Sequence, residues 1–210
     1  MFASDLPASG LWPLQGEAFE FSMCGAAEAT SHLETLPAVE AASPLNQAQY
    51  ADRFVCAYVE GELAFWEWAE LGDIGVPPDA LPGAVDGAHT ATLFGAHTRP
   101  AYRGRGLFTA GCRWLMEALA KQGYGRLCSS VALDNRPSVC AHLSAGMVIV
   151  GECGWRTWRG RRRVLPSRRL GVPVGAGHQG ALPAGLSPRA ARELALALGC
   201  LSRRPPPNGG

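Results

Sequence analysis

The stretch "HTRPAYRGRGLFTAGCRWLMEAL", residues 97–119, joins a basic, glycine-rich loop to an apolar segment. It holds four arginines and three glycines, and it becomes apolar and periodic at Leu107. The helical spacing of the apolar residues predicts a helix over 107–122 that ends before Gly123. A helix N-terminus presents free N–H groups and the positive end of the helix dipole, and glycines let an anion approach them closely. The stretch therefore predicts a phosphate-binding site.

The sequence around this loop predicts a domain in which strands and helices are mixed along the chain. The run "RFVCAYVEGELAFWEWAEL" (53–71) predicts an antiparallel hairpin that turns at Glu60-Gly61, because Gly supplies the positive φ that a tight turn needs. The run "HTATLFGAHT" (89–98) predicts the next strand. Further strands are expected at 17–24, 126–133, 147–158 and 161–170, and helices within 26–52 and over 136–145.

The 210 residues are most simply one domain with additional chain at both ends. We expect a loose lead-in over residues 1–14, the domain over 15–170, and a C-terminal appendage over 171–210. The appendage should contain one short helix, capped by Ser187 and running to Gly199, and a disordered tail. The Pro/Gly-rich segment 72–87 is expected to be a long loop.

Charge is divided unevenly along the chain. Residues 1–98 hold one cation against fourteen Asp and Glu, whereas residues 99–210 hold eighteen Lys and Arg against four acidic residues. The two halves therefore carry −13 and +14, which sum to the net charge of +1. The basic half favours an anionic ligand, and the acidic half favours a cationic one.

Several classes of protein are disfavoured by composition. The seven cysteines are odd in number and form no C-x-x-C pair, which argues against a disulfide framework and a zinc site, so no metal is expected. No run of about 18 apolar residues occurs, so no membrane-spanning helix is expected. The first residues lack a basic segment followed by an apolar one, so we expect no signal peptide and a cytoplasmic protein.

Two phosphate-binding designs fit the loop poorly. The Walker type requires Gly-Lys followed by Ser or Thr, which the sequence lacks. The dinucleotide fingerprint G-x-G-x-x-G would use Gly104 and Gly106, but Thr109 occupies the place of the third glycine. Its acidic ribose ligand would be Asp134, which lies farther from the loop than the usual spacing of about twenty residues.

The loop resembles the coenzyme-A-binding signature R/Q-x-x-G-x-G/A of the GNAT superfamily of acyl-CoA-dependent N-acyltransferases. A second motif agrees: the family often has an Asn after the fifth strand, then a helix and a Gly, and Asn135 and Gly146 have this spacing. The resemblance covers about residues 89–152 and extends to 53. The residues that match or replace the signature are Arg103, Gly104, Arg105, Gly106, Leu107 and Phe108, the last in a place usually held by a small residue.

The resemblance implies a GNAT-type α+β fold, in which a mixed, mostly antiparallel central sheet is flanked by helices. It also implies direct transfer of an acetyl or other short acyl group from acyl-CoA to a primary amine. The phosphates would bind the backbone amides of residues 103–108, and N–H groups near Thr98 would polarise the thioester carbonyl. Asn135 and Ser138 would contact the coenzyme. Acetyl-CoA, or another acyl-CoA, would be the cosubstrate.

The transfer needs a neutral amine and a protonated leaving thiolate. His97, at the end of the strand 89–98, is a candidate base because the ordinary pKa of histidine suits neutral pH. Glu67 and Glu70 are alternatives, although such hairpin charges ordinarily face solvent, and water can also remove the proton. His142 replaces a frequent tyrosine of the family and is the candidate acid. This role needs a raised pKa, because neutral imidazole is a poor acid.

Two rival functions remain open at this point. The segment "WRTWRGRRRVLPSRR" (155–169) has seven arginines and two tryptophans, a composition that can bind nucleic acid, although a solvated basic edge explains it with less. The chain could also bind acyl-CoA without transferring the acyl group, as a sensor or interaction module. The expected partner is a small-molecule or peptide amine, cationic because the N-terminal half is acidic. A homodimer is left open, and no membrane partner is expected.

Overall fold

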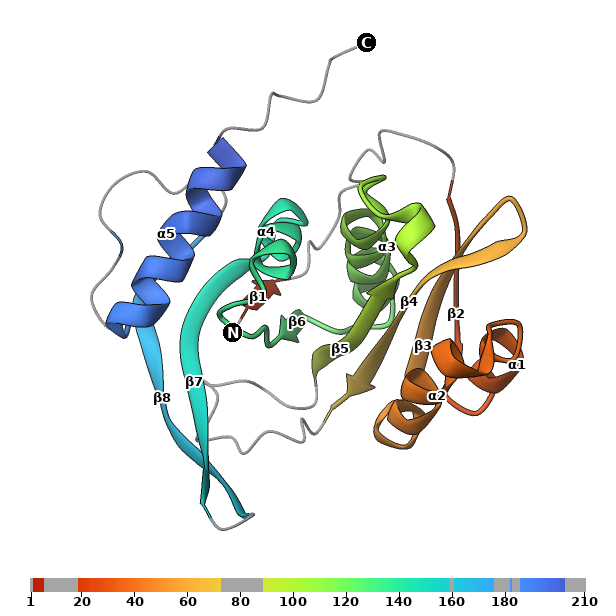
Figure 1. The fold of residues 1–210 in the computed structure, drawn as a ribbon, viewed down its shortest axis with the longest axis horizontal. Coiled ribbons are helices and arrows are strands. Elements are labelled where there is room, and N and C mark those ends of the chain that lie inside the picture. Colours follow the sequence, from red (N-terminus) through yellow and green to blue (C-terminus); the bar gives the residue numbers. More distant parts are fainter. Residues whose placement is uncertain are drawn as a thin grey trace. The chain divides into compact units, whose positions relative to one another are not determined.

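The computed structural model describes residues 2–5, 19–72, 89–158, 161–175, 182 and 186–202. The chain divides into two compact units (Figure 1). The first unit comprises Asp5–Ile74 and Asp86–Ser129, and the second comprises Met1–Ser4, Gly75–Val85 and Ser130–Gly210. The loop predicted over 72–87 and the tail predicted after the last helix fall outside the described residues, except at Gly72 and Ser202.

The first unit is built on a five-stranded mixed sheet. The strands follow the order β2-β3-β4-β5-β6, in which β5 and β6 are parallel and every other neighbouring pair is antiparallel. This arrangement confirms the predicted fold class. Only the strand predicted over 126–133 is clearly shorter than expected. The strands are β2 (Glu20–Gly25), β3 (Arg53–Val59), β4 (Glu62–Leu71), β5 (Thr90–Thr98) and β6 (Arg126–Ser129).

The β3–β4 hairpin turns where the sequence predicts. Glu60 has φ 54° and Gly61 has φ 82°, so both central residues adopt the left-handed conformation. A two-residue turn of this hand matches the twist of the strands, and Gly adopts it without steric cost. A β-bulge between Ala57 and Tyr58 then shifts the register by one residue, so that Trp66 and Trp68 lie opposite Cys56 and Phe54.

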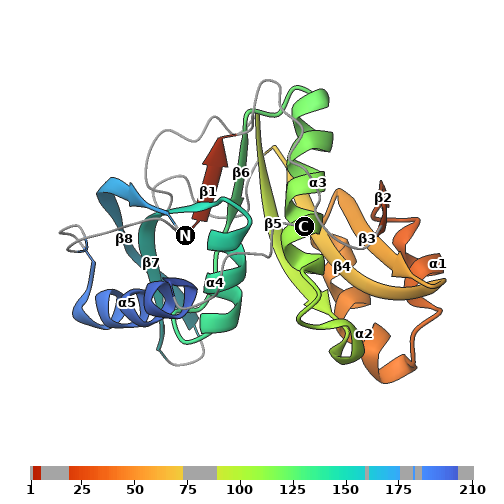
Figure 2. The ribbon, with the colours of Figure 1, turned by 90° about the horizontal axis from the view of Figure 1, so that it is seen from above.

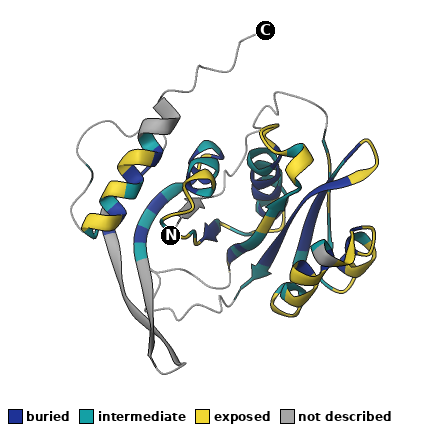
Figure 3. Cartoon of the chain, viewed as in Figure 1, coloured by how far each residue is buried: buried dark blue, intermediate teal, exposed yellow. Residues whose placement is uncertain are grey.

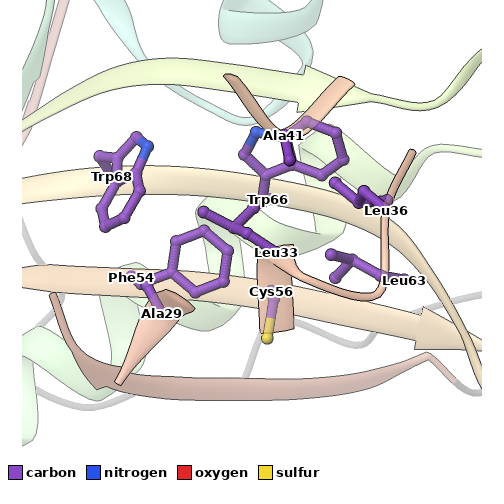
Figure 4. Close-up of a cluster of buried hydrophobic side chains, with 9 residues drawn as sticks. All are labelled: Ala29, Leu33, Leu36, Ala41, Phe54, Cys56, Leu63, Trp66 and Trp68. Carbon is purple, nitrogen blue, oxygen red and sulfur yellow. The ribbon is translucent and has the colours of Figure 1, made fainter. Parts of the chain in front are cut away.

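One face of the sheet is covered by two short helices, α1 (Ala29–Leu33) and α2 (Ala38–Gln47). Pro37 lies at the N-cap of α2, where a residue without an N–H is tolerated. Figure 4 shows the buried cluster beneath these helices. Its members are Ala29, Leu33, Leu36, Ala41, Phe54, Cys56, Leu63, Trp66 and Trp68. Both tryptophans of β4 therefore pack inward, as their alternation predicts.

The other face packs against α3 (Leu107–Lys121). Here Phe65 of β4 contacts the helix, and the close approach requires glycine at position 111, where a Cβ would lie 2.7 Å from the Phe65 ring. Helices thus cover both faces of β3 and β4, and Figure 3 shows these strands almost wholly buried. In Figure 2, α3 extends alongside β5. The helix is followed by Gly123 with φ 89°, the conformation expected after a helix C-terminus.

The described residues of the second unit form three strands and two helices. β7 (Val148–Trp158) pairs antiparallel with both β1 (Phe2–Asp5) and β8 (Arg161–Val174). The helices are α4 (Arg136–Ser144) and α5 (Pro188–Ser202). The prediction of a loose lead-in is therefore wrong for residues 2–5. A four-residue strand is too short to show a pattern of its own, and its pairing with β7 stabilises it.

The C-terminal helix packs against α4. Arg136 pairs with Glu193 at 2.7 Å, and the Cys140 thiol lies 3.6 Å from the Ala197 carbonyl oxygen. Ser187 caps α5 by accepting a hydrogen bond from the Ala190 N–H at 3.2 Å, as predicted. The helix extends past Gly199 to Ser202, so its predicted end is wrong by three residues. None of the helices that the structure describes is long and apolar enough to span a bilayer.

Candidate coenzyme and acyl-transfer site

The loop before α3 has the backbone conformation of an anion site. Gly104 has φ 81° and Gly106 has φ 82°, a region that residues with a Cβ rarely adopt. A Cβ built at either glycine meets no atom within 4 Å, so the front of the loop is open. Gly106 is the N-cap of α3, and no side chain of the described residues caps this terminus. The first N–H groups of a 15-residue helix are therefore available to a ligand.

The next two residues contribute backbone and not side chains to this site. Leu107 is buried in a second apolar cluster that includes Phe65, and Phe108 packs against this cluster with its ring 6.3 Å from the Phe65 ring. The bulky residue at 108 therefore turns toward the core. It does not fill the space beside the loop glycines. The bulk of Phe108, in a place usually held by a small residue, therefore does not obstruct the loop.

The loop is tied to the preceding strand and hairpin by polar contacts. Arg103 Nε donates to the Thr98 carbonyl at 3.0 Å, and the Arg105 guanidinium lies 5.7 Å from the centre of the Tyr102 ring. The Tyr102 hydroxyl donates to Glu62 Oε2 at 2.7 Å. Both arginines are exposed, so their charges are accessible to an anion in front of the loop. The site can therefore bind phosphate groups through amides and two guanidinium groups.

The strand that leads into the loop is irregular. Trp66 pairs with His97 and Trp68 with Phe94, so Glu67 lies opposite two residues, Gly95 and Ala96. This β-bulge is made possible by Gly95, which has φ 63° and where a Cβ would overlap the side-chain amide of Gln47. An isolated Gly within a strand pattern is the signal from which the bulge could have been predicted.

The parallel neighbour of this strand ends early. β6 pairs with β5 from Thr90 to Leu93, and the described register goes no further. The last five residues of β5, including Thr98, therefore continue beyond the paired region. In a parallel pair, this is where an extended ligand can insert and take up backbone N–H and C=O groups. It is also the place where the sequence resemblance puts the thioester.

His97 stands at this end of β5 with its ring stacked on Trp66, at 4.5 Å between centroids and 22° between planes. Burial lowers the pKa of His97, the charges of Arg103 and Arg99 lower it further, and Glu40 partly opposes them. The ring is therefore neutral at pH 7. A neutral imidazole is the form that accepts a proton, so the structure gives His97 the protonation state that a base needs.

The two hairpin carboxylates, predicted to face solvent, differ in their burial. Glu67 is fully buried, and burial raises its pKa to about 8. Neither of its carboxyl oxygens has a hydrogen-bond partner among the described residues. It lies on the α3 face near Cys112, whose own pKa is raised by burial and by Glu67. Glu70 is half-buried. The expectation that both face solvent is wrong for Glu67, because α3 covers the face of β4 that carries it.

The remaining candidate residues lie on α4, in the second unit. Asn135 is the N-cap of α4, and its side-chain oxygen accepts from the Ser138 N–H at 3.3 Å. This contact gives Asn135 a structural role. Ser138 and His142 share a helix face, as predicted, with Ser138 Oγ 3.4 Å from His142 Nδ1. Contacts of either residue with the coenzyme stay predictions.

His142 does not have the raised pKa that its predicted role as an acid requires. Burial lowers the pKa of His142 to about 4, whereas proton donation near neutral pH needs a raised value. Nδ1 lies 2.7 Å from the Ser138 carbonyl oxygen. Because that oxygen can only accept, Nδ1 carries the proton, and Nε2 of the neutral ring has none to give.

We therefore expect His142→Phe to keep any loss of turnover that the wild type shows at high pH. Removing a group that is neutral and has no proton at Nε2 cannot abolish the titration of a donor. The measurement is kcat against pH with a saturating acyl donor and amine. A Phe variant that loses both the alkaline limb and most of kcat would restore His142 as the acid.

No protein-family model matches the chain, and no curated protein is similar enough to serve as a relative. Solved structures do match. The chain is similar to the aminoglycoside N-acetyltransferase AAC(6′)-Iy in complex with CoA, with a TM-score of 0.52 and 16% identity over 71% of this chain and 99% of that one. The chain has the GNAT acetyltransferase fold.

Two further structures with the GNAT fold also match. An acetyltransferase of the GNAT family from Streptococcus pneumoniae has a TM-score of 0.46 and 15% identity over 75% of this chain and 100% of that one. A ribosomal-protein-alanine N-acetyltransferase from Brucella melitensis biovar Abortus 2308 has a TM-score of 0.42 and 15% identity over 58% and 86%. At these identities the likeness shows the fold, and function must be argued from the site.

One group of site residues was not predicted from the sequence. Arg99 Nε contacts Glu40 Oε2 at 3.2 Å, and Arg99 Nη1 contacts Glu62 Oε2 at 3.4 Å and the Leu63 carbonyl at 3.3 Å. These contacts connect α2, the hairpin and the end of β5 beside His97. The basic residues around the loop can be seen in the sequence. The partners of Arg99 lie 59 and 37 residues away, so no local pattern indicates these contacts.

Proposed function

We propose that the chain transfers an acetyl or other short acyl group from an acyl-CoA to a primary amine. The observation that carries this proposal is the loop before α3, with two left-handed glycines, an open front and an uncapped helix N-terminus. Such a backbone suits a pyrophosphate. The GNAT fold supports the assignment, since the solved structures of this fold that match include N-acetyltransferases.

Each part of the proposed site has a chemical task. Amides of residues 103–108, with the Arg103 and Arg105 side chains, hold the phosphates of the coenzyme. When bound, the coenzyme supplies an acyl group activated as a thioester. Backbone N–H groups at the end of β5, near Thr98, polarise its carbonyl. His97, neutral and stacked on Trp66, takes the proton from the attacking amine. Solvent protonates the departing thiolate.

The test is a panel of acyl-CoAs in a thermal-shift assay, followed by a screen of amines with detection of free thiol. We expect acetyl-CoA or another short acyl-CoA to raise the melting temperature, and at least one primary amine to release CoA. The variant that tests the proposed base is His97→Gln, which should bind the acyl donor and lose most of kcat. Binding without turnover on any amine would instead favour a coenzyme-binding module.

The acceptor should be a cation. The N-terminal half carries −13, and its exposed acidic residues in the first unit include Glu28, Glu34, Glu60 and Glu62. An acidic surface raises the local concentration of cations, so polyamines, aminoglycoside-like amines or basic peptides should give higher kcat/KM than acidic amino acids. The difference should shrink as salt is added, because exposed charges are screened. A screen in which glutamate-like amines react best would exclude this acceptor class.

A further inference from the structure

The two arginines of the coenzyme loop lie in different surroundings. Arg103 folds back onto the preceding strand, where its Nε donates to the Thr98 carbonyl at 3.0 Å. The Arg105 guanidinium lies over the Tyr102 ring. Arg103 is therefore held against the strand that carries His97, one residue before Thr98. Its charge is fixed near the candidate base, and its exposed side chain remains open to a ligand of the loop.

The charges that act on His97 come from three places. Glu40 belongs to α2, Arg99 follows β5, and Arg103 belongs to the loop, while Trp66 of β4 stacks on the ring. After burial, the largest influence on the pKa of His97 is the charge of Arg103, which lowers it.

These two arginines differ in how their charges are compensated. Arg99 contacts two carboxylates, those of Glu40 and Glu62. Among the described residues no carboxylate pairs with Arg103, whose partner is a neutral carbonyl. A negative charge placed beside Arg103 would therefore compensate its positive charge.

We propose that Arg103 couples binding of the coenzyme to protonation of His97. This inference rests on the proposed function, because it requires the coenzyme phosphates to bind in the loop. A phosphate beside Arg103 cancels the positive charge that disfavours the imidazolium. His97 then holds a proton more tightly in the complex than in the free protein, so it becomes the stronger base when the acyl donor is in place.

The coupling has a reciprocal consequence. If the coenzyme favours the protonated imidazole, then protonation favours the coenzyme by the same factor. Coenzyme affinity should therefore rise as the pH falls through the titration range of His97, which in the free protein lies below the ordinary value of 6.5. An amine would therefore be deprotonated more effectively once the acyl donor had bound.

The experiment is an NMR titration of the His97 ring in the free protein and with saturating CoA, with calorimetry on the same samples. The His97 resonance is assigned by its absence in His97→Gln. In the wild type, CoA should move the titration midpoint to higher pH. Arg103→Gln should raise the midpoint of the free protein and remove most of the shift caused by CoA. Arg105→Gln is the matched control and should keep that shift, because Arg105 is not among the charges that act on His97.

The outcomes separate this inference from the function on which it rests. If calorimetry shows no binding of CoA, both the proposed function and the coupling are wrong. If CoA binds and the midpoint of His97 does not move, the coupling alone is wrong. A shift that Arg105→Gln removes and Arg103→Gln keeps would overturn the assignment to Arg103. The titration is read without any turnover, so an inactive variant still gives an answer.

Discussion

Glu67→Gln should flatten the pH dependence of stability and make the protein more stable than the wild type above neutral pH. The folded-state pKa of Glu67 is about 8 and the ordinary value is 4.5, so the folded chain binds this proton more tightly than the unfolded chain. Below about pH 4.5 the carboxyl is protonated in both states, so its titration costs the wild type no stability. It loses stability as the pH rises to about 8, by about 3 kcal/mol at pH 7 and about 5 kcal/mol at most. Glutamine has no such proton.

The measurement is urea unfolding of both proteins between pH 4.5 and 9. Glu70→Gln, on the same strand but half-buried, is the control and should keep the slope of the wild type. Glu67→Met serves as a second variant, since it fills a similar volume and also removes the unpartnered oxygens. A wild-type curve parallel to that of Glu67→Gln across this range would show that Glu67 is not buried as a neutral acid.

Gly106→Val should abolish coenzyme binding while the fold survives. Gly106 has φ 82°, which costs a residue with a Cβ about 1–2 kcal/mol, and valine is β-branched and fits this region poorly. The side chain would project into the open space in front of the loop, where no protein atom lies within 4 Å. It would therefore meet the phosphates and not the core. Affinity for acetyl-CoA should fall by about 100-fold or more, because several charge-assisted hydrogen bonds to the phosphates would be lost.

The chain offers a matched control in Gly123→Val. Gly123 has φ 89° and open space around it, so valine there meets a similar backbone strain at the other end of α3. Both variants should lose similar stability in thermal unfolding, and only Gly106→Val should fail to bind acetyl-CoA in calorimetry. Equal and unchanged affinity in two folded variants would disprove the phosphate assignment of the loop.

Local signals were sufficient for the hairpin and for the loop. Glu60-Gly61 specifies a tight turn by itself, and the glycines before Leu107 specify an open helix N-terminus, because both features depend on a few neighbouring residues. Such features can be predicted from a single sequence. The mixed, mostly antiparallel sheet was expected from the resemblance and not from local pattern.

Features that depend on distant packing could not be predicted in this way. Glu67 follows Phe65 on one face of β4, but the sequence does not tell whether a helix covers that face, since one face of an antiparallel sheet is often solvated. The state of His142 depends on burial of its ring and on the Ser138 carbonyl. In both cases the residue type suggested the chemistry, and the surroundings changed the protonation state.

The overlap between Gly95 and Gln47 constrains how this protein can evolve or be redesigned. A side chain at position 95 would require the Gln47 amide to move, and the φ of 63° adds backbone strain to any substitution. A change of α2 that moves Gln47 therefore also changes the support of the bulge in β5. Substitutions at residues 47 and 95 therefore depend on each other, although the residues are 48 positions apart. A library that alters α2 for new acceptors should keep this pair fixed or randomise both positions together.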